Sequence, residues 1–168
     1  SRPGMAYVSI VGRRLGVETI NLGFSGSGRG EPEVARCVAA VSKAALFVLD
    51  YVANVDPDRM RETFPGFVRT LRERHPDVPI LALDRIRCPQ ELFSEEADAR
   101  RRSYTDFLRD HVEELRQAGD EHVHFHSMAD ACGEDFHECT VDRSHPNDLG
   151  FMRMADELVP VIGRLLAR

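Results

Sequence analysis

Two short, uninterrupted apolar runs constrain the fold of this chain more than any other feature. They lie at residues 45–49 (Ala-Leu-Phe-Val-Leu) and 79–83 (Pro-Ile-Leu-Ala-Leu). A strand with one face in water alternates apolar and polar side chains, whereas a strand covered on both faces is apolar throughout. Residues 57–74, between the runs, have the spacing of an amphipathic helix. The order strand, helix, strand predicts a parallel sheet covered on both faces.

The rest of the chain continues this alternation. Its 168 residues suit one core, and 42% hydrophobic with 30% charged residues is typical of a globular protein. We therefore predict a three-layer α/β/α sandwich in a single domain over residues 1–168. The predicted helices cover residues 4–15, 31–43, 57–74 (interrupted around Pro65-Gly66), 95–118 and 148–167 (kinked at Pro160), and the predicted strands cover residues 17–22, 45–49, 79–83 and 122–126.

The charge of the chain limits its partners. A net charge of −6 weighs against nucleic acid, because phosphate binding requires a basic surface. The arginines at residues 100–102 lie among acidic residues and predict a solvated helix face. No apolar run approaches the roughly 18 residues of a membrane span. Because no secretory signal is visible either, we expect a cytoplasmic location.

A polar segment near the C-terminus holds the best candidate for catalysis. Asp142 precedes His145 by three residues, in the sequence Asp-Arg-Ser-His-Pro. A carboxylate at this spacing can accept a hydrogen bond from one ring nitrogen and leave the other free to take a proton. Pro146 favours an extended backbone at His145, and Asn147 or Asp148 can cap the helix that follows. The segment predicts a general base, although an ordinary polar loop can have the same composition.

Two other polar segments follow predicted strands. Residues 23–30 are glycine-rich, but they fit neither the Gly-x-Gly-x-x-Gly spacing of a dinucleotide site nor the Gly-x-Ser-x-Gly of a nucleophile elbow. Asn54 comes just after the run at 45–49, where asparagine is often only a turn residue. Ligands of parallel sheets bind at the carboxyl ends of the strands. We therefore expect these segments and the histidine at one edge of the sheet.

Taken in order, these segments resemble motif blocks of the SGNH (GDSL-like) esterases and acyltransferases. Residues 21–26 (Asn-Leu-Gly-Phe-Ser-Gly) resemble the second block, Asn54 the third, and the Asp142-to-His145 segment the last. The resemblance covers nearly the whole chain. It implies that the Gly26 N–H and the Asn54 side-chain amide bind the oxyanion, while Asp142 orients His145 as the base.

The nucleophile block of the family is missing from this sequence. SGNH enzymes begin with a strand ending in Gly-Asp-Ser or a close variant, and no such pattern occurs here. Ser1 lies too far along, on the approach to the first predicted helix. We therefore expect the nucleophile upstream of Ser1, in a longer polypeptide whose first strand completes a flavodoxin-like sheet between residues 17–22 and 45–49. Ser25 or Ser27 is the alternative nucleophile.

The resemblance implies a serine esterase or acyl hydrolase. It would act on a small-molecule ester through an acyl-serine intermediate, without a metal or organic cofactor. Two alternatives stay open. An acyltransferase would use the same residues and pass the acyl group to an alcohol, and a non-catalytic binding module would keep the fold alone.

Histidines suggest one competing site. His122, His124 and His126 alternate along a predicted strand, so they face the same way and could bind zinc together with His137. No acid or cysteine occurs at zinc-site spacing, which favours a strand whose histidines meet solvent or loops.

The four cysteines lack the Cys-x-x-Cys spacing of zinc and redox sites. Cys37 is expected as a small core residue of a helix. Cys132 and Cys139 could close a loop by a disulfide in an oxidising compartment, and free thiols are expected otherwise.

Overall fold

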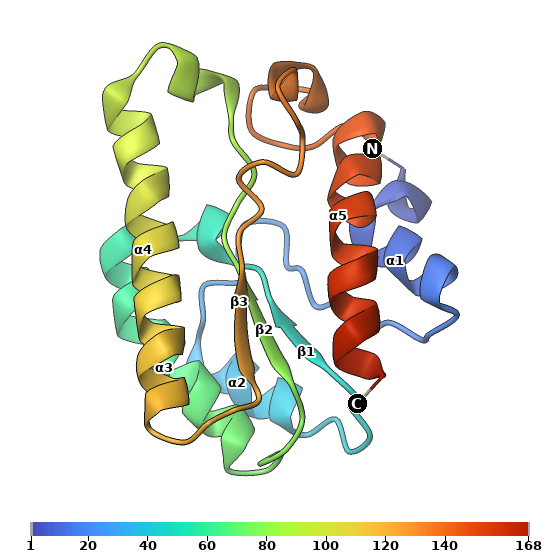
Figure 1. The fold of residues 1–168 in the computed structure, drawn as a ribbon, viewed down its shortest axis with the longest axis vertical. Coiled ribbons are helices and arrows are strands. Elements are labelled where there is room, and N and C mark those ends of the chain that lie inside the picture. The colour runs from blue at the N-terminus through green and yellow to red at the C-terminus, as the bar shows by residue number, and fades with distance from the viewer. Residues whose placement is uncertain (1, 168) are drawn as a thin grey trace. The chain divides into compact units, whose positions relative to one another are not determined.

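A computed structural model describes residues 2–167. Helices and strands alternate along the chain (Figure 1), which confirms the predicted α/β class. The helices are α1 (Tyr7–Leu15), α2 (Pro32–Ala39), α3 (Pro57–Arg72), α4 (Glu95–Gln117) and α5 (Asp148–Leu166), and the strands are β1 (Phe47–Leu49), β2 (Ile80–Leu83) and β3 (Val123–His126). Short 3-10 helices are η1 (Pro3–Met5), η2 (Val52–Asn54), η3 (Pro89–Leu92) and η4 (Phe136–Cys139).

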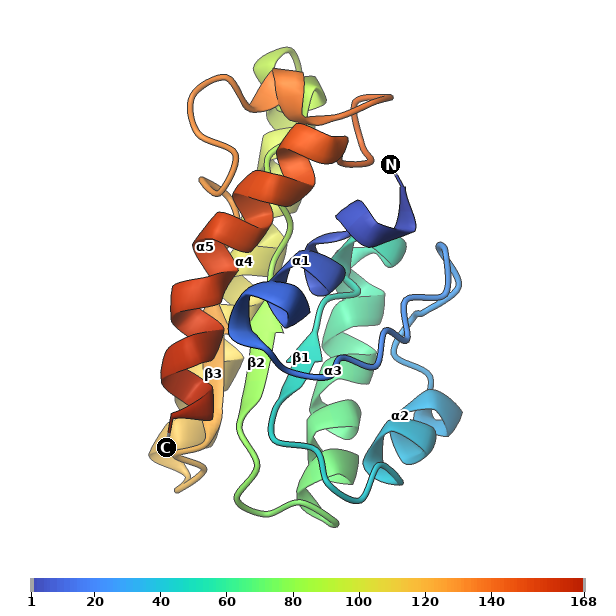
Figure 2. The same ribbon diagram turned by 90° about the vertical axis from the view of Figure 1, so that its right-hand side faces the viewer.

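The strands form one parallel sheet with β2 in the centre (Figure 2). Phe47 pairs with Ile80, and Ile80 pairs with Val123, so the three strands start in register. The predicted strands at 45–49, 79–83 and 122–126 are therefore confirmed.

The predicted strand over residues 17–22 is wrong. This segment has no regular secondary structure. Val17, Ile20 and Leu22 are 39%, 60% and 41% exposed. A strand is stabilised when its side chains pack on a pleated, half-buried surface. Apolar side chains that stay in solvent gain none of that stabilisation, so composition alone misled the prediction here.

The chain forms two compact units. The sheet unit comprises Leu22–Arg85 and Arg102–Ser127, and the terminal unit comprises Ser1–Asn21, Ile86–Arg101 and Met128–Arg168.

The sheet unit is built on one hydrophobic core. Because side chains alternate along a strand, every second residue of the sheet points into this core. The strand residues are Phe47, Leu49, Ile80, Ala82 and Val123, and the largest helical contributions come from Met60, Phe64, Phe67 and Leu71 of α3 and from Tyr104 and Leu108 of α4. Helix α2 packs on α3 within the same unit.

The central strand is buried on both faces, as its apolar run predicted. Leu81 and Leu83 point away from the core of the sheet unit and are nevertheless 1% and 0% exposed. Val48 of β1, which alternates with the core residues of its strand, is 36% exposed. The run at 45–49 is therefore less completely covered than the run at 79–83.

Helix α3 continues through Pro65-Gly66, contrary to the predicted interruption. A proline inside a helix costs about 3 kcal/mol, because it removes one hydrogen bond and crowds the preceding turn. Phe64 and Phe67 flank the proline and are 1% and 6% exposed. Burial of two such side chains contributes roughly 1.5–3 kcal/mol each, which offsets the cost of the proline. Asp56 caps the helix by accepting a hydrogen bond from the Arg59 N–H at 2.8 Å.

The terminal unit is organised around the pair α1 and α5, which pack against each other. The rings of Tyr7 and Phe151 lie 6.5 Å apart, and Gly163 of α5 lets the Leu15 side chain approach. The segment η4 packs on α5 as well. Helix α5 runs through Pro160 without a break. No helix of residues 2–167 is both long enough and apolar enough to cross a membrane.

Candidate active site

The terminal unit carries the predicted acid and base on an exposed loop. Asp142 accepts three hydrogen bonds: Oδ1 from the N–H groups of Ser144 (3.1 Å) and His145 (2.8 Å), and Oδ2 from His145 Nδ1 (2.7 Å). These bonds stabilise the ionised carboxylate, so that the pKa of Asp142 falls to about 2, chiefly through the His145 N–H and ring. A carboxylate can only accept, and Nδ1 therefore carries the ring proton. Nε2 is left as the basic nitrogen of His145.

The backbone of this loop, residues 140–147 (the His loop), is a tight hairpin. Thr140 and Pro146 form an isolated antiparallel bridge, and the Val141 N–H donates to the His145 carbonyl at 2.9 Å. At the turn, Arg143 has φ +72°, a region that side chains other than glycine rarely adopt. The three bonds to Asp142 compensate this local strain, because they hold the chain on either side of Arg143.

The start of α5 fixes the base of the His loop. Asn147 caps the helix by accepting from the Gly150 N–H at 2.9 Å, which confirms one of the two predicted caps. Its side-chain amide donates to the Glu138 carbonyl at 2.6 Å, and its own N–H donates to the Cys139 carbonyl at 2.9 Å. A Cβ at Gly150 would collide with that carbonyl. The loop is therefore anchored to α5 on both sides of its base.

The His145 side chain is 78% exposed, and Nδ1 is its one bonded ring atom among the described residues. Its Nε2 is free to accept a proton from a group that approaches from outside the loop. The arrangement holds the ring in one tautomer, as the predicted role of general base requires.

The sheet unit carries the predicted oxyanion residues. The glycine loop, residues 23–30, turns at Ser25 and Gly26, which have φ +47° and +85°, and the turn is closed by the Ser27 N–H on the Phe24 carbonyl at 2.9 Å. The Arg29 guanidinium Nε donates to the Gly26 carbonyl at 3.3 Å. A positive charge therefore lies beside the proposed oxyanion turn.

Asn54 lies at the end of η2, just beyond β1, and contacts the glycine loop. Its side-chain Nδ2 donates to the Gly28 carbonyl at 3.1 Å. The contact is with Gly28 and not with Gly26, on which the resemblance placed the oxyanion N–H. An amide nitrogen has two hydrogens, so one donor of Asn54 remains for an oxyanion while the other holds the loop.

Sequence reasoning missed the residues that support this contact. Gly30 has φ +74°, and a Cβ there would lie 2.6 Å from Thr63 Oγ1 and 2.8 Å from the Tyr51 hydroxyl. Tyr51 and Thr63 are hydrogen-bonded to each other at 3.1 Å, and burial raises the pKa of Tyr51 to about 12. The glycine loop therefore ends at Gly30 in close contact with the buried hydroxyl pair of Tyr51 and Thr63. Any side chain at position 30 would collide with this pair. The one available signal was the position of Tyr51, two residues past a buried strand.

Asp84 was missed as well. It follows β2, is 1% exposed, and its Oδ2 accepts from Thr105 Oγ1 at 2.6 Å and Ser127 Oγ at 2.8 Å. Because Ser127 follows β3 and Thr105 lies on α4, this carboxylate joins the carboxyl ends of two strands to a helix. An aspartate after an apolar run is a common pattern at strand ends, and its spacing gave no indication of these partners.

The site residues are thus described as two pairs. Asp142 and His145 form a hydrogen-bonded pair in the terminal unit, whereas Gly26 and Asn54 belong to one loop system in the sheet unit. Convergence of the two pairs on one centre stays a prediction. Ser1, the residue upstream of which the nucleophile is expected, lies outside the described residues.

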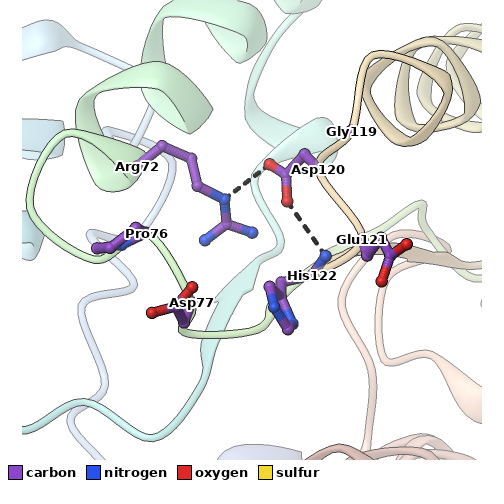
Figure 3. Close-up of a pocket in the computed structure, with 7 residues that line it drawn as sticks. All are labelled: Arg72, Pro76, Asp77, Gly119, Asp120, Glu121 and His122. Atoms are coloured by element: carbon purple, nitrogen blue, oxygen red, sulfur yellow. Dashed lines mark hydrogen bonds and ion pairs between the residues drawn. The ribbon is translucent and has the colours of Figure 1, made fainter.

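A surface pocket of about 420 Å³ lies elsewhere, where the chain enters β2 and β3 (Figure 3). Arg72 donates through Nε to Asp120 at 2.7 Å and through Nη1 to the Val78 carbonyl at 2.6 Å, which ties the segments before the two strands together. The pocket is at the amino ends of the strands, and two of its lining residues, Arg72 and Asp120, are bonded to each other. Of the residues predicted for a site, it contains His122 alone.

The metal alternative finds no support in the described residues. Among residues 2–167, no group of three or more histidines, cysteines or acids is placed to hold a metal ion. His124 and His126 lie on β3, paired with Leu81 and Leu83 of the neighbouring strand, while His122 precedes the strand and lines the pocket.

Comparisons with known proteins extend this description. Residues 1–163 match the GDSL-like Lipase/Acylhydrolase family. The chain is similar to a Bacteroides ovatus protein assigned to the GDSL-like lipases, with a TM-score of 0.91 and 38% identity over 99% of this chain and 49% of that one. No curated protein matches the chain with significant sequence similarity.

More distant structures share the fold. Salicylyl-acyltransferase SsfX3 from a tetracycline biosynthetic pathway has a TM-score of 0.78 and 23% identity, over 100% of this chain and 52% of that one. A family two carbohydrate esterase from Clostridium thermocellum has a TM-score of 0.65 and 18% identity, over 98% of this chain and 55% of that one.

The chain spans about half the length of the first two of these structures. The family match nevertheless covers all but the last few residues. The resemblance to this family is therefore confirmed, and the chain belongs to the GDSL-like lipase/acylhydrolase family.

Proposed function

We propose that this chain supplies the base and the oxyanion-binding residues of a serine esterase that hydrolyses small-molecule esters. The observation that carries the proposal is the 2.7 Å hydrogen bond between Asp142 Oδ2 and His145 Nδ1, which leaves Nε2 basic on an exposed ring. Membership in a family of acylhydrolases supports the same chemistry.

The nucleophile of this proposal is a serine upstream of Ser1. His145 Nε2 takes the hydroxyl proton as the serine oxygen bonds to the ester carbonyl carbon, and Asp142 stabilises the imidazolium that forms. The tetrahedral intermediate collapses, the C–O bond to the alcohol breaks, and the alcohol leaves with the proton from His145. Water then attacks the acyl-serine by the same proton transfers and releases the acid.

Gly26 and Asn54 serve the oxyanion in this proposal. The Gly26 N–H and the second hydrogen of Asn54 Nδ2 would donate to the oxygen that becomes negative in the transition state. One such donor is typically worth on the order of 10²–10³ in rate. The Arg29 guanidinium, bonded to the Gly26 carbonyl at 3.3 Å, adds a positive charge beside the same turn.

Water is the acceptor in this proposal. The His145 ring is 78% exposed, so that solvent has access to the nitrogen that would activate it. An acyltransferase would need an alcohol bound at that position in preference to water. The two reactions differ in the product formed when an alcohol is added, since a hydrolase still gives mainly the free acid.

The test is ester hydrolysis by the full-length protein, with 4-nitrophenyl acetate as the substrate. His145→Ala should lower kcat/KM by on the order of 10⁴–10⁶, as for removal of a catalytic base elsewhere. His137→Ala is the matched control: His137 is also an exposed histidine of the terminal unit beside an acid, Glu138, at 3.7 Å. Equal loss in both variants, or no loss in either, would contradict the proposal. Transfer to added glycerol in preference to water would favour the acyltransferase.

A further inference from the structure

Three of the four cysteines belong to the terminal unit, and two of them are completely buried next to each other. Cys132 and Cys139, the thiol pair, are both 0% exposed. The Cys139 thiol donates to the Cys132 carbonyl at 3.9 Å, and Cys139 is close enough to the Cys132 thiol to help raise its pKa. The structure holds both as free thiols, and the proposed ester hydrolysis uses neither.

Arg153 of α5 holds the segment between the two cysteines in this position. Its Nη1 donates to the Cys132 carbonyl and contacts Cys139 Sγ at 3.5 Å, so one guanidinium group touches both residues of the pair. It also binds the Asp135 carboxylate through both terminal nitrogens, at 2.6 and 3.1 Å. Gly133, with φ +73°, lets the chain reverse direction directly after Cys132. The approach of the thiols is therefore built into the fold of the segment.

The thiol pair lies directly under the His loop. The Cys139 carbonyl accepts the Asn147 N–H at 2.9 Å, and Thr140, the next residue, forms the bridge that closes the loop. Gly150 packs against Cys139 so closely that a Cβ would collide with its carbonyl. A covalent bond at Cys139 would thus act on the residue that anchors the loop of Asp142 and His145.

We propose that Cys132 and Cys139 are a disulfide site, oxidised by a low-molecular-weight disulfide such as oxidised glutathione, and that the bond fixes the base of the His loop. In the first step one thiolate attacks a sulfur of the oxidant and expels one thiolate of glutathione. In the second step the other cysteine attacks the mixed disulfide, forms the Cys132–Cys139 bond and expels the second glutathione. The protein loses two electrons and two protons, and the oxidant gains them.

The rate of this reaction in the folded protein is limited by burial. Loss of solvent raises the pKa of the Cys132 thiol to about 12, and the neighbouring Cys139 adds to the rise. The thiolate is the attacking species, so a buried and protonated pair reacts slowly. Cys37, which is exposed on α2, offers an internal comparison. We expect glutathione to react with Cys37 first, and the pair to close over minutes to hours as the segment opens locally.

The bond should be visible without any activity measurement. Residues 117–143 contain no internal Lys or Arg, so trypsin releases both cysteines in one peptide. The full-length protein is incubated with oxidised glutathione, blocked with N-ethylmaleimide, digested and analysed by mass spectrometry. We expect this peptide without a maleimide group and lighter by two hydrogen atoms, and dithiothreitol before blocking should restore two maleimide groups. A peptide that takes up two maleimides after oxidation, retains glutathione, or is linked to Cys88 would overturn the proposal.

Thermal unfolding tests whether the bond stabilises the protein by fixing the base of the His loop. A disulfide that closes so short a loop should raise the Tm by roughly 5 °C, because it restricts the unfolded chain. The variant with Cys37→Ser and Cys88→Ser should keep the whole shift between reduced and oxidised protein, whereas Cys132→Ser should abolish it. A Tm shift that persists in Cys132→Ser would contradict the proposal that the disulfide fixes the base of the His loop. The same holds if the peptide shows the bond but the Tm does not change.

Discussion

The two candidate pairs are held in place in different ways. In the His loop, every bond to Asp142 comes from a residue within three positions, and the loop base is fixed by the cap of the helix that follows. In the sheet unit, Asn54 reaches a carbonyl 26 positions away, and the approach depends on Gly30 passing over a buried hydroxyl pair.

The difference predicts different responses to mutation. A pair held by local bonds loses chemistry when its own atoms change, but it tolerates changes in a distant core. A contact between distant segments is lost when the packing behind it changes, even if Asn54 itself is intact. Mutations in the His loop should therefore lower kcat/KM with little change in the free energy of unfolding. Mutations in the glycine loop should lower both.

The largest effect is expected from Asp142→Asn in the full-length protein. An asparagine amide at Oδ2 can donate to Nδ1, which would leave the ring proton on Nε2 and remove the base. By the precedent of serine proteases, kcat/KM for 4-nitrophenyl acetate should fall by up to about 10⁴, with little change in unfolding free energy. Ser144→Ala is the control, because only the backbone N–H of Ser144 bonds to Asp142. If both variants retain wild-type kcat/KM, the pair has no catalytic role.

A smaller loss is expected when Asn54, the proposed oxyanion donor, is removed. Asn54→Ala should lower kcat by on the order of 10²–10³ with KM changed much less, because the donor acts on charge that develops in the transition state. The same variant also releases Gly28, and we expect a measurable loss of stability beside the loss of rate. A lower kcat without any loss of stability would mean that the Asn54–Gly28 bond does not hold the glycine loop.

Stability alone should respond at Gly30. Gly30→Ala places a Cβ against Thr63 and Tyr51 in a backbone region that disfavours side chains, so we expect a loss of about 2–4 kcal/mol in urea unfolding. Gly119→Ala is the control: Gly119 has φ +104° with open space around its Cβ position and should cost only about 1–2 kcal/mol. Equal losses of unfolding free energy in the two variants would show that the contact with Tyr51 and Thr63 does not restrict the residue at position 30.

The smallest effect concerns pH. The pKa of Asp142 is about 2 in the folded chain against an ordinary value of 3.8, so the unfolded chain binds the proton more readily. The contribution of this carboxylate to stability is therefore fully present above pH 3.8 and is lost as the pH falls through about 2. Carbon NMR titration of the Asp142 carboxyl should give a midpoint near 2, which should rise towards the ordinary value in His145→Ala. An Asp142 midpoint near 3.8 in the unmutated protein would show that the three hydrogen bonds are absent in solution.

Local patterns were predictable from the sequence where a few neighbouring residues decide the structure. The apolar runs at 45–49 and 79–83 gave two strands, and the spacing of Asp142 and His145 gave a bonded pair. The predicted strand at residues 17–22 was wrong, because a strand also depends on the segments that cover it. The predicted interruption at Pro65 was wrong, because burial of the apolar side chains of α3 outweighs the local preference of proline. The prediction of Cys37 as a core residue was also wrong, because this residue lies on the solvent-exposed side of its helix.

Contacts between distant segments were not predictable in the same way. The resemblance placed Gly26 and Asn54 together as oxyanion residues, but nothing in the spacing indicated that the Asn54 amide is bonded to Gly28. Asp84 follows an apolar run, but nothing in the local sequence indicates its partners on α4 and after β3. Such networks arise from the register of strands and helices, which single-sequence periodicity does not determine.

Locating the nucleophile tests most directly whether His145 is the base of a serine hydrolase. The full-length protein is treated with a fluorophosphonate, and the modified residue is identified by peptide mass spectrometry. We predict a modified serine upstream of Ser1, no modification of the isolated 168-residue chain, and loss of labelling in His145→Ala because a hydroxyl is a poor nucleophile without its base. A label on Ser25 or Ser27, or labelling that persists in His145→Ala, would contradict the assignment of base and nucleophile.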